Sequence, residues 1–173
     1  MKELRYAGGL TLKRSFPAVV DGRTRILILG SLPGEASLAR GQYYAHPQNQ
    51  FWSLLGAVIN KDLRALAYPD RLEALLSHRI GLWDVVAEAR RDGSLDGSIR
   101  DHAPNDLAAL AATLPDLRAI GFNGGTAARI GGRQLSGIKE LPALLPLPSS
   151  SPAYTRPFAE KLEDWLKLRT YLQ

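Results

Sequence analysis

The segment Ile26-Leu27-Ile28-Leu29 is apolar at every position, and Gly30 and a turn containing Pro33 and Gly34 follow it. A strand with one solvated face alternates apolar and polar residues, whereas a strand buried on both faces of a parallel sheet does not. The segment 25–30 is therefore predicted to be such a strand. Because a parallel sheet needs helices on both of its faces, this segment predicts an α/β fold.

Strand-like and helix-like patterns alternate along the rest of the chain. Apolar runs predict further strands over 80–86, 117–122 and 141–147. Apolar residues at helical spacing predict helices over 51–59, from 70, from about 105, through 127–130 and from about 155. We expect Asp70 and Asn105 to cap two of these helices. The polar segment 92–102 is assigned to a mobile surface loop over 88–102, to which no role is given.

The composition limits the class of protein. A chain of 173 residues suits one domain, so residues 1–173 are assigned to a single domain. The sequence has no cysteine, which excludes disulfides, thiolate zinc sites, iron–sulfur clusters and a cysteine nucleophile. No apolar run approaches the ~18–20 residues that span a bilayer, and no signal peptide is visible, so a cytoplasmic protein without a membrane partner is expected. The net charge of +5 favours an anionic partner.

Several common catalytic motifs are absent from the sequence. Neither of the glycine-rich phosphate loops of dinucleotide and nucleoside triphosphate sites is present, and there is no Gly-x-Ser-x-Gly nucleophile motif. The three histidines, His46, His78 and His102, do not have metal-ligand spacing. We therefore expect neither a metal nor a nucleotide cofactor.

Three polar or glycine-rich segments follow predicted strands: 30–34, 123–125 and 148–152. In parallel sheets, ligands bind at the carboxyl ends of the strands, so these segments are expected to meet in one site. Tyr43 and Tyr44 offer flat faces and Asn49 offers a carboxamide, which together suit a planar heterocycle. The alternative is structural, with Tyr43 in the core and Asn49 as a helix cap.

The serine-rich segment 149–151 is the second feature with possible chemistry. Hydroxyls and backbone amides just before a helix suit a phosphate contact, although a solvated turn has the same composition. Asn123 can read polar edges, or it can cap the following helix.

In their order along the chain, these motifs resemble those of the uracil-DNA glycosylase superfamily. The branch most similar in its motifs is that of the hypoxanthine-DNA (deoxyinosine) glycosylases, which carry a Gly-Ser-x-Pro-Gly turn, a Tyr-Tyr-x-His-Pro-x-Asn-x-Phe-Trp segment and a Leu-Pro-Ser-Ser/Thr-Ser-Pro turn. The matching segments are 30–34, 43–52 and 147–152, with further similarity at 15–17 and 81–85.

The resemblance implies a three-layer α/β/α sandwich with a central four-stranded parallel sheet. It implies a DNA glycosylase without cofactors that hydrolyses the N-glycosidic bond of a deaminated base in double-stranded DNA. We expect a monomer that acts in the cytoplasm and associates with the nucleoid by binding DNA. Two departures from other branches, Leu32 in the first turn and Leu147 at the start of the last, favour hypoxanthine over uracil.

The resemblance also implies roles for particular residues. Asn49 would position the attacking water, Tyr44 would stack on a base flipped out of the duplex, Tyr154 would be the wedge that fills the gap, and Asp84 would orient a loop. Contacts to the base are assigned to Gly30, Ser31, Leu32, Pro33, Gly34, Tyr44, His46 and Asn123. Contacts to DNA are assigned to Gly124, Ser149, Ser150, Ser151, Tyr154 and Arg156.

Other readings stay open at this point. The substrate could instead be uracil in any context, or a mismatch of uracil or thymine with guanine. Alternatively, the chain could be a nucleic-acid-binding module that has the same fold but no catalytic activity. A small-molecule α/β enzyme is disfavoured by the missing phosphate motifs. Lyase chemistry needs an amine, and because nothing in the sequence brings Lys61 or Lys139 into the site, a monofunctional hydrolase is expected.

Overall fold

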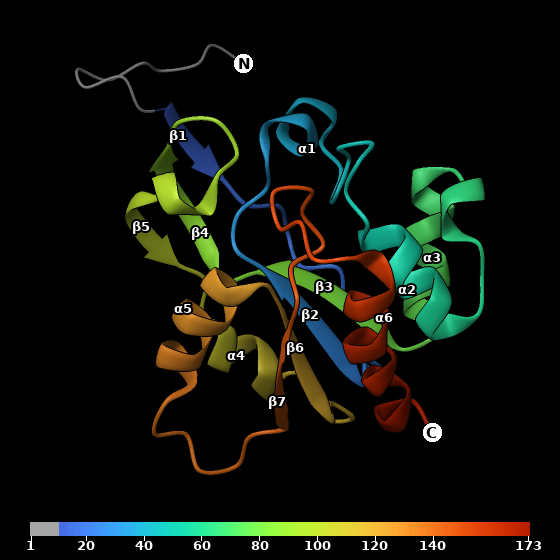
Figure 1. The fold of residues 1–173 in the computed structure, drawn as a ribbon. Coiled ribbons are helices and arrows are strands. Elements are labelled where there is room, and N and C mark those ends of the chain that lie inside the picture. Colours follow the sequence, from blue (N-terminus) through green and yellow to red (C-terminus); the bar gives the residue numbers. More distant parts are fainter. Residues whose placement is uncertain (1–10) are drawn as a thin grey trace.

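The computed structural model describes residues 11–173. A four-stranded parallel sheet with the strand order β3-β2-β6-β7 lies at its centre (Figure 1). Every residue of the two inner strands is buried, which accounts for the uninterrupted apolar run at 26–29. The strands are β2 (Ile26–Gly30), β3 (Ile80–Asp84), β6 (Ala119–Asn123) and β7 (Ala143–Leu147).

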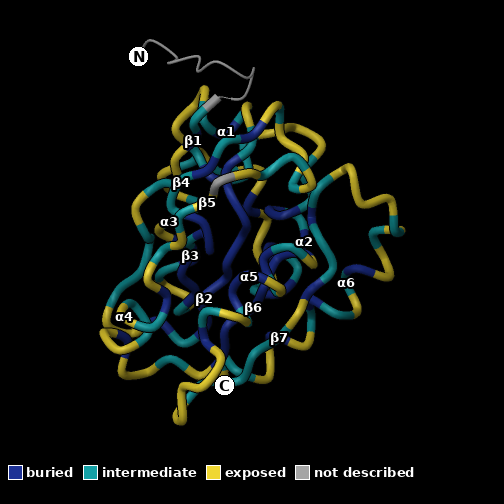
Figure 2. Tube along the Cα trace, turned by 90° about the vertical axis from the view of Figure 1, so that its left-hand side faces the viewer, coloured by how far each residue is buried: buried dark blue, intermediate teal, exposed yellow. Residues whose placement is uncertain are grey.

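Successive side chains of β2 pack into two different cores, one on each face of the sheet. Ile26 and Ile28 belong to the core that α2, α3 and α6 cover, whereas Leu27 and Leu29 belong to the core that α4 and α5 cover. Figure 2 shows the buried trace running through the middle of the molecule between these layers. The helices are α2 (Phe51–Ile59), α3 (Tyr68–Ser77), α4 (Leu107–Ala112), α5 (Gly125–Leu135) and α6 (Phe158–Leu166). The predicted α/β/α sandwich is confirmed.

A second, antiparallel sheet corrects the prediction of a surface loop over 88–102. Its strand order is β1-β4-β5, with β1 (Thr11–Arg14), β4 (Val86–Arg91) and β5 (Arg100–Pro104). The segment predicted as one strand over 80–86 is divided, because β3 ends at Asp84 and β4 begins in the other sheet. Register shifts between β4 and β5 disturb the alternation by which such strands are predicted.

Two predicted helix caps are also wrong. The helix α3 begins at Tyr68 with a proline in its first turn, so Asp70 lies inside the helix. The cap of α4 is Asp106, whose side chain accepts a 3.0 Å hydrogen bond from the amide of Ala109. Asn105 instead donates its side-chain amide to the backbone oxygen of Asp84, at 2.8 Å.

The remaining helical elements are short. The helix α1 follows the turn after β2 and was not predicted, because six residues are too few for a helical period to be recognised. The helix predicted from about 155 begins at Phe158, after Pro157, and its end is a 3-10 turn. These short elements are α1 (Glu35–Arg40), η1 (Leu63–Ala65), η2 (Asp96–Ser98) and η3 (Lys167–Tyr171). Within residues 11–173, no helix is long and apolar enough to cross a bilayer.

Two adjacent glycines of α5 offer a test of how closely this helix packs on the sheet. A Cβ on Gly131 would lie 2.4 Å from a ring carbon of Phe122, whereas a Cβ on Gly132 would meet no atom within 4 Å. We expect Gly131→Ala to lower the free energy of unfolding by about 1–3 kcal/mol. Gly132→Ala, the matched control, is expected to leave it unchanged or raise it by up to about 1 kcal/mol. Equal unfolding midpoints for the two variants in urea would contradict this packing.

Candidate active site

A cleft of about 710 Å³ opens where the strands of the parallel sheet end. The whole of the predicted segment 30–34 lines it, as do residues 149–152 of the predicted segment 148–152. Asn123 lines it from the third segment, 123–125. Asn49, Tyr44 and His46 contribute from the loop before α2. Of the sequence-predicted residues, Gly124 and Arg156 do not line this cleft.

The turn after β2, residues 30–34, forms one wall of the cleft. A Cβ on Gly30 would lie 2.7 Å from Asp84 Oδ1 and 2.8 Å from the Tyr44 hydroxyl oxygen. Real Cβ atoms do not approach other atoms so closely, so only glycine leaves room for these two side chains. Gly30 therefore acts by the absence of a side chain.

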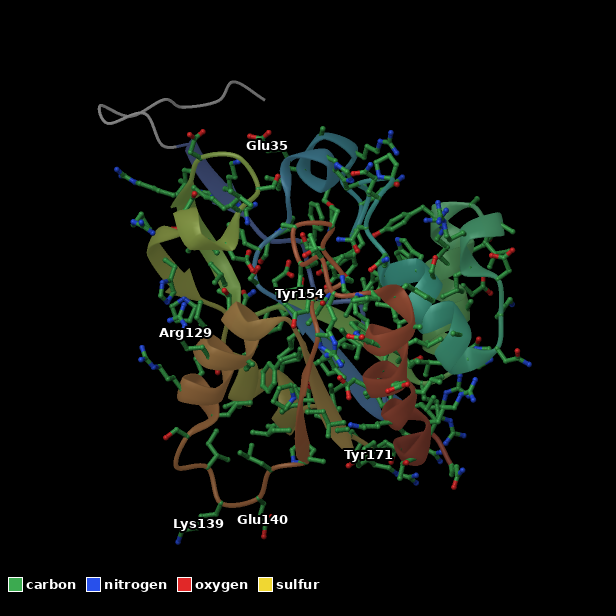
Figure 3. All side chains as sticks on the ribbon, viewed as in Figure 1. Glu35, Arg129, Lys139, Glu140, Tyr154 and Tyr171 are labelled. Atoms are coloured by element: carbon green, nitrogen blue, oxygen red, sulfur yellow. The ribbon has the colours of Figure 1, made fainter. Side chains whose placement is uncertain are left out.

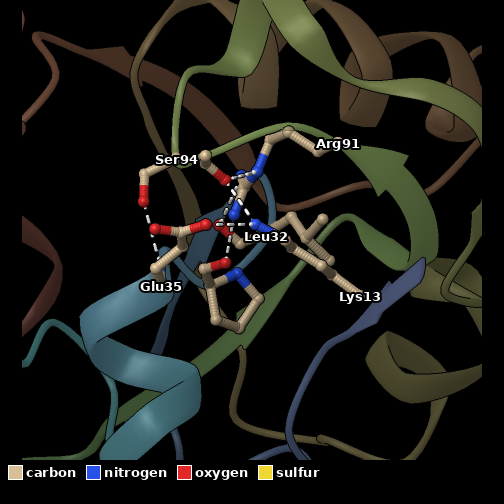
Figure 4. Close-up of polar contacts among 7 residues, drawn as sticks. Lys13, Leu32, Glu35, Arg91 and Ser94 are labelled. Carbon is tan, nitrogen blue, oxygen red and sulfur yellow. Dashed lines mark hydrogen bonds and ion pairs between the residues drawn. The ribbon is translucent and has the colours of Figure 1, made fainter. Parts of the chain in front are cut away.

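The same turn is held by Arg91 of β4, which is completely buried (Figure 4). Its guanidinium donates to the backbone oxygens of Leu32, Pro33 and Gly93. Burial lowers the pKa of Arg91, and the nearby carboxylate of Asp96 opposes that shift. The second sheet thus supports the turn through β4. The sequence did not reveal this role because β4 has no recognisable strand pattern.

A second group of contacts joins the start of α1 to the segment after β4 (Figure 4). Lys13 of β1 donates to the Gly93 oxygen at 2.6 Å and pairs with Glu35 at 3.2 Å. The amide of Glu35 donates to Ser94 Oγ at 2.9 Å. These contacts fix the rim of the cleft beside the turn 30–34.

Asp96 is a residue of the cleft that sequence reasoning missed. The Ser31 hydroxyl donates to Asp96 Oδ1 at 2.6 Å, and the Arg91 guanidinium lies 3.8 Å from the same oxygen. Burial raises the pKa of Asp96, while the hydroxyl and the guanidinium oppose the rise. Ser31 was expected to contact a base. Because its hydroxyl proton is donated to Asp96, the Ser31 hydroxyl could only accept a hydrogen bond from a base.

Asn49 lies half-buried at the edge of the cleft, immediately before α2. Its side-chain Oδ1 accepts a 3.0 Å hydrogen bond from the backbone amide of Phe51. The backbone amide of Asn49 donates to the backbone oxygen of His46, also at 3.0 Å. His46 is exposed, and its Nδ1 accepts a hydrogen bond from the amide of Gln48 at 3.1 Å. Asn49 therefore has a cap-like contact and also faces the cleft, so the two readings made from the sequence are compatible.

Tyr44 lies deep in the cleft with a left-handed backbone (φ 53°). Its ring stacks on Phe51 with a centroid distance of 3.7 Å and an interplanar angle of 15°, so one of its two faces is covered. Its buried hydroxyl oxygen has no hydrogen-bond partner. Burial raises the pKa of Tyr44, with a further contribution from Asp84, and the neighbouring Asn123 side chain opposes the shift.

Asn123, at the end of β6, fixes the serine turn (residues 148–152). Its Nδ2 donates to Ser150 Oγ and its Oδ1 accepts from the Ser150 amide, both at 2.9 Å. The turn after β6 needs glycine, because Gly124 has a φ of 96° and a Cβ there would lie 3.1 Å from Ser149 Cβ.

Two helices hold the other side of the serine turn. The amide of Gln50 donates to the Ser150 oxygen at 3.0 Å, which links the turn to the segment that carries Asn49. From α6, Trp165 donates to the Pro148 oxygen at 2.9 Å, and buried Lys161 donates to the Ser151 oxygen at 3.4 Å. The serine turn and Asn49 therefore form one connected wall.

Two large apolar side chains stand exposed on the rim of the cleft, Tyr154 at 46% and Leu95 at 61%. Figure 3 shows Tyr154 on the loop between β7 and α6. Arg156, which was expected to contact phosphate, is paired with Glu160 at 3.2 Å and with Asp164 at 3.1 Å. Any phosphate contact of Arg156 would compete with these two carboxylates.

No group of three or more metal-ligating side chains occurs in the described part of the chain, residues 11–173. The polar side chains of the cleft are hydroxyls, carboxamides, the His46 imidazole and the carboxyls of Glu35, Asp84 and Asp96. Such a set can bind a planar polar molecule and position a water.

Comparison with known proteins identifies the family. The profile of the uracil DNA glycosylase superfamily matches residues 17–173. The chain belongs to this superfamily. Within the uracil DNA glycosylase superfamily, it is similar to two proteins named hypoxanthine DNA glycosylase. The protein of Methanosarcina barkeri is 48% identical over 112 residues, which are 65% of this chain and 71% of that protein. The protein of Methanosarcina acetivorans is 49% identical over 113 residues, which are 65% and 72% of the two chains.

The fold of the chain is also that of a solved superfamily structure. The solution NMR structure of a Methanosarcina acetivorans protein, provisionally described as a uracil DNA glycosylase, aligns with a TM-score of 0.83 and 42% identity. The alignment covers 93% of this chain and 98% of the other. The membership predicted from the motifs is therefore confirmed.

Proposed function

We propose that the protein is a monofunctional DNA glycosylase that hydrolyses the N-glycosidic bond of hypoxanthine in double-stranded DNA, acting as a monomer. The observation that carries the proposal is the cleft in which Asn49, Tyr44 and the serine turn converge at the ends of the strands. The identity of nearly half to two proteins named hypoxanthine DNA glycosylase supports the choice of base.

A base inside a duplex is out of reach, so the nucleotide must rotate into the cleft at a cost of a few kcal/mol. Phe51 covers one face of the Tyr44 ring, and the other face would stack on the extruded base. This stacking would offset the cost of extrusion by about 1–3 kcal/mol. The cleft volume of about 710 Å³ accommodates a nucleoside.

Asn49 positions the water that attacks the anomeric carbon. A carboxamide is too weak a base to remove a proton early, so its contribution is orientation. Its Oδ1 already accepts from Phe51, which fixes the plane of the carboxamide and leaves a second lone pair and both Nδ2 protons for water and sugar. A water held there could reach a sugar whose phosphates lie on the neighbouring serine turn.

The serine turn would contact the phosphates on either side of the extruded nucleotide. Ser149 Oγ accepts from the Ser151 amide at 3.1 Å, and Ser151 Oγ accepts from the Ala153 amide at 3.2 Å. Because both hydroxyl oxygens accept bonds, their protons point away from these amides and are available to phosphate oxygens. Phosphates held beside the sugar stabilise its oxocarbenium-like transition state, so a carboxylate nucleophile is not required.

The second candidate activity is excision of uracil, or of uracil or thymine mismatched with guanine. The alternatives are separated by measuring base release from duplexes that carry hypoxanthine, uracil, xanthine or mismatched thymine. Each duplex is incubated with the protein under single-turnover conditions, and the abasic sites formed are then cleaved and counted. We expect the largest rate for hypoxanthine. Faster release of uracil would replace the proposed substrate, and binding without any abasic product would favour a module without turnover.

The absence of strand cleavage is expected in the same assay before alkaline treatment. No lysine lines the cleft among residues 11–173, and neither Lys61 nor Lys139 does so. An enzyme that attacks the sugar with an amine would cut the strand and form a borohydride-trapped adduct. Such an adduct would contradict a monofunctional hydrolase.

The exposed Tyr154 side chain is proposed to be the wedge that fills the gap in the duplex. Tyr154→Ala is expected to lower the rate of hypoxanthine release from duplex about tenfold or more, because the extruded state loses the few kcal/mol of unstacking that the wedge compensates. The rate on single-stranded DNA, which needs no wedge, should change little. Leu95→Ala is the matched control, since Leu95 is also exposed on the rim. A larger loss on duplex from Leu95→Ala than from Tyr154→Ala would assign the wedge to the opposite rim.

A further inference from the structure

The floor of the cleft holds a carboxyl group that the proposed mechanism does not use. Asp84, the last residue of β3, is 3% exposed and lines the cleft, and its buried Oδ2 has no hydrogen-bond partner. A carboxyl buried without a donor is costly, and such groups in native structures usually have a specific function. The Asp84 side chain therefore lacks the contacts expected of the loop-orienting role assigned to it from the sequence.

The backbone around Asp84 is fixed on both sides. Its oxygen accepts from the Asn105 side chain at 2.8 Å, and the amide of Val85 donates to the Gly30 oxygen at 2.8 Å. The neighbouring cation does not pair with it directly, because the Arg91 guanidinium donates to backbone oxygens and forms its ion pair with Asp96. The backbone of Asp84 is thus fixed, and its carboxyl, which lines the cleft, forms no ion pair with any residue of the range 11–173.

The Tyr44 hydroxyl oxygen is a second buried oxygen of the cleft without a hydrogen-bond partner. Asp84 Oδ1 and the Tyr44 oxygen both lie within 2.8 Å of the position that a Cβ on Gly30 would occupy. Asp84 and Tyr44 thus meet over a glycine, and each carries one buried oxygen without a partner, Oδ2 in Asp84 and the hydroxyl oxygen in Tyr44. Polar atoms of a bound molecule would supply the missing partners.

We propose that Asp84, as a neutral carboxyl, recognises the lactam edge of the extruded base. This inference rests on the proposed function, and it names a group that selects bases with such an edge. In hypoxanthine the lactam edge is N1–H beside the carbonyl oxygen O6. The Asp84 carbonyl oxygen accepts from N1–H, and the Asp84 hydroxyl donates to O6.

The chemistry of this edge separates hypoxanthine from adenine, the base from which deamination produces it. Adenine carries an amino group in place of O6 and has no hydrogen on N1. Its amino group would face the Asp84 hydroxyl, and a buried donor without an acceptor is expensive. The same edge occurs in guanine, thymine, uracil and xanthine, so Asp84 separates bases with a lactam edge from adenine and cytosine.

The electrostatic surroundings favour the neutral forms. Burial and the negative Asp96 raise the pKa of Asp84 to about 7, against the opposing effect of Arg91. The other titratable groups acting with Asp84 are Tyr43 and Tyr44, whose pKa values burial raises, so that both phenols stay protonated. Below pH 7, Asp84 is therefore mainly neutral, and above pH 7 it becomes a carboxylate that repels O6.

The test compares the intact chain with Asp84→Ala and Asp84→Asn in single-turnover release of hypoxanthine from duplex, from about pH 5.5 to about pH 9. An asparagine presents the same pair, an acceptor for N1–H and a donor for O6, but does not titrate. We expect Asp84→Ala to lower the rate by about 10²-fold or more. Asp84→Asn should recover most of that loss and should lack the decline above pH 7 that the unmodified chain shows. Ionisation of N1–H in the substrate affects all three proteins, so the Asp84→Asn profile contains that effect alone.

Three results would overturn the inference. The first is an Asp84→Ala rate equal to that of the unmodified chain. The second is an Asp84→Asn rate as low as that of Asp84→Ala, together with a rise above pH 7 in the unmodified chain, which would show that the carboxylate is the active form. The third is a lowered unfolding temperature for Asp84→Asn that accompanies a lowered rate of release, which would make the role structural. If the unmodified chain releases no deaminated base, the proposed function itself fails, and that outcome is distinct from these three.

Discussion

Replacing Asn49 by alanine is expected to lower the single-turnover rate of hypoxanthine release by about 10²–10³-fold, the usual cost of removing one group that orients or stabilises the reacting atoms. The variant loses the carboxamide that would hold the attacking water, while the cleft, the serine turn and Tyr44 keep their positions. Affinity for duplex DNA carrying hypoxanthine should change little, because phosphate contacts supply most of it. The measurement is a single-turnover time course beside a binding titration with the same duplex.

The variant also loses the hydrogen bond between Asn49 Oδ1 and the Phe51 amide. That loss resembles the removal of a helix cap and should lower the free energy of unfolding by about 0.5–2 kcal/mol, too little to explain a rate loss of this size. Gln48→Ala is the matched control, since Gln48 is exposed, adjoins Asn49 and does not line the cleft. Unchanged release by Asn49→Ala would remove Asn49 from the mechanism.

The central sheet could be predicted from the sequence because its strands carry an unambiguous pattern. The segment at 26–29 is apolar at every position, and a strand in which every residue is buried produces that pattern. The position of the cleft followed from it, since the turns after parallel strands meet at one edge of the sheet. Asn49 and the serine turn could be named because they lie in such turns and also match family motifs.

The second sheet and the carboxyls could not be predicted in the same way. β4 contains three arginine or glutamate side chains among its six residues, and its register against β5 shifts twice, so no period of two is visible. Arg91 and Asp96 owe their roles to contacts between β4, η2 and the turn 30–34, which are distant in sequence. The unpartnered oxygen of Asp84 is a property of the folded chain alone, because hydrogen-bond satisfaction depends on three-dimensional neighbours.

Gly30→Ala is expected to cause a second large loss of activity, through the space between Asp84 and Tyr44. The added methyl would lie 2.7 Å from Asp84 Oδ1 and 2.8 Å from the Tyr44 oxygen, so both side chains must move. Neither moves freely, because Tyr44 is stacked on Phe51 and the backbone of Asp84 is held by Asn105. A displacement of about 1 Å in groups that hold a substrate can lower a rate about 10²-fold, and we expect a loss of that order for hypoxanthine.

The controls for Gly30→Ala separate this effect from general damage. Overpacking at this position should lower the free energy of unfolding by about 1–3 kcal/mol, which chemical denaturation would measure. Gly22→Ala, where a Cβ would meet no atom within 4 Å, should change neither stability nor rate.

The decisive comparison for Gly30 is the double variant Gly30→Ala with Asp84→Ala. If the methyl acts by displacing Asp84, the two rate losses share one cause and should not add, since residues in contact deviate from additivity. The double variant should then release hypoxanthine about as slowly as Asp84→Ala does. Losses that multiply would mean that Gly30 acts independently of Asp84, and a Gly30→Ala rate equal to that of the unmodified chain would mean that no base occupies the space between Asp84 and Tyr44.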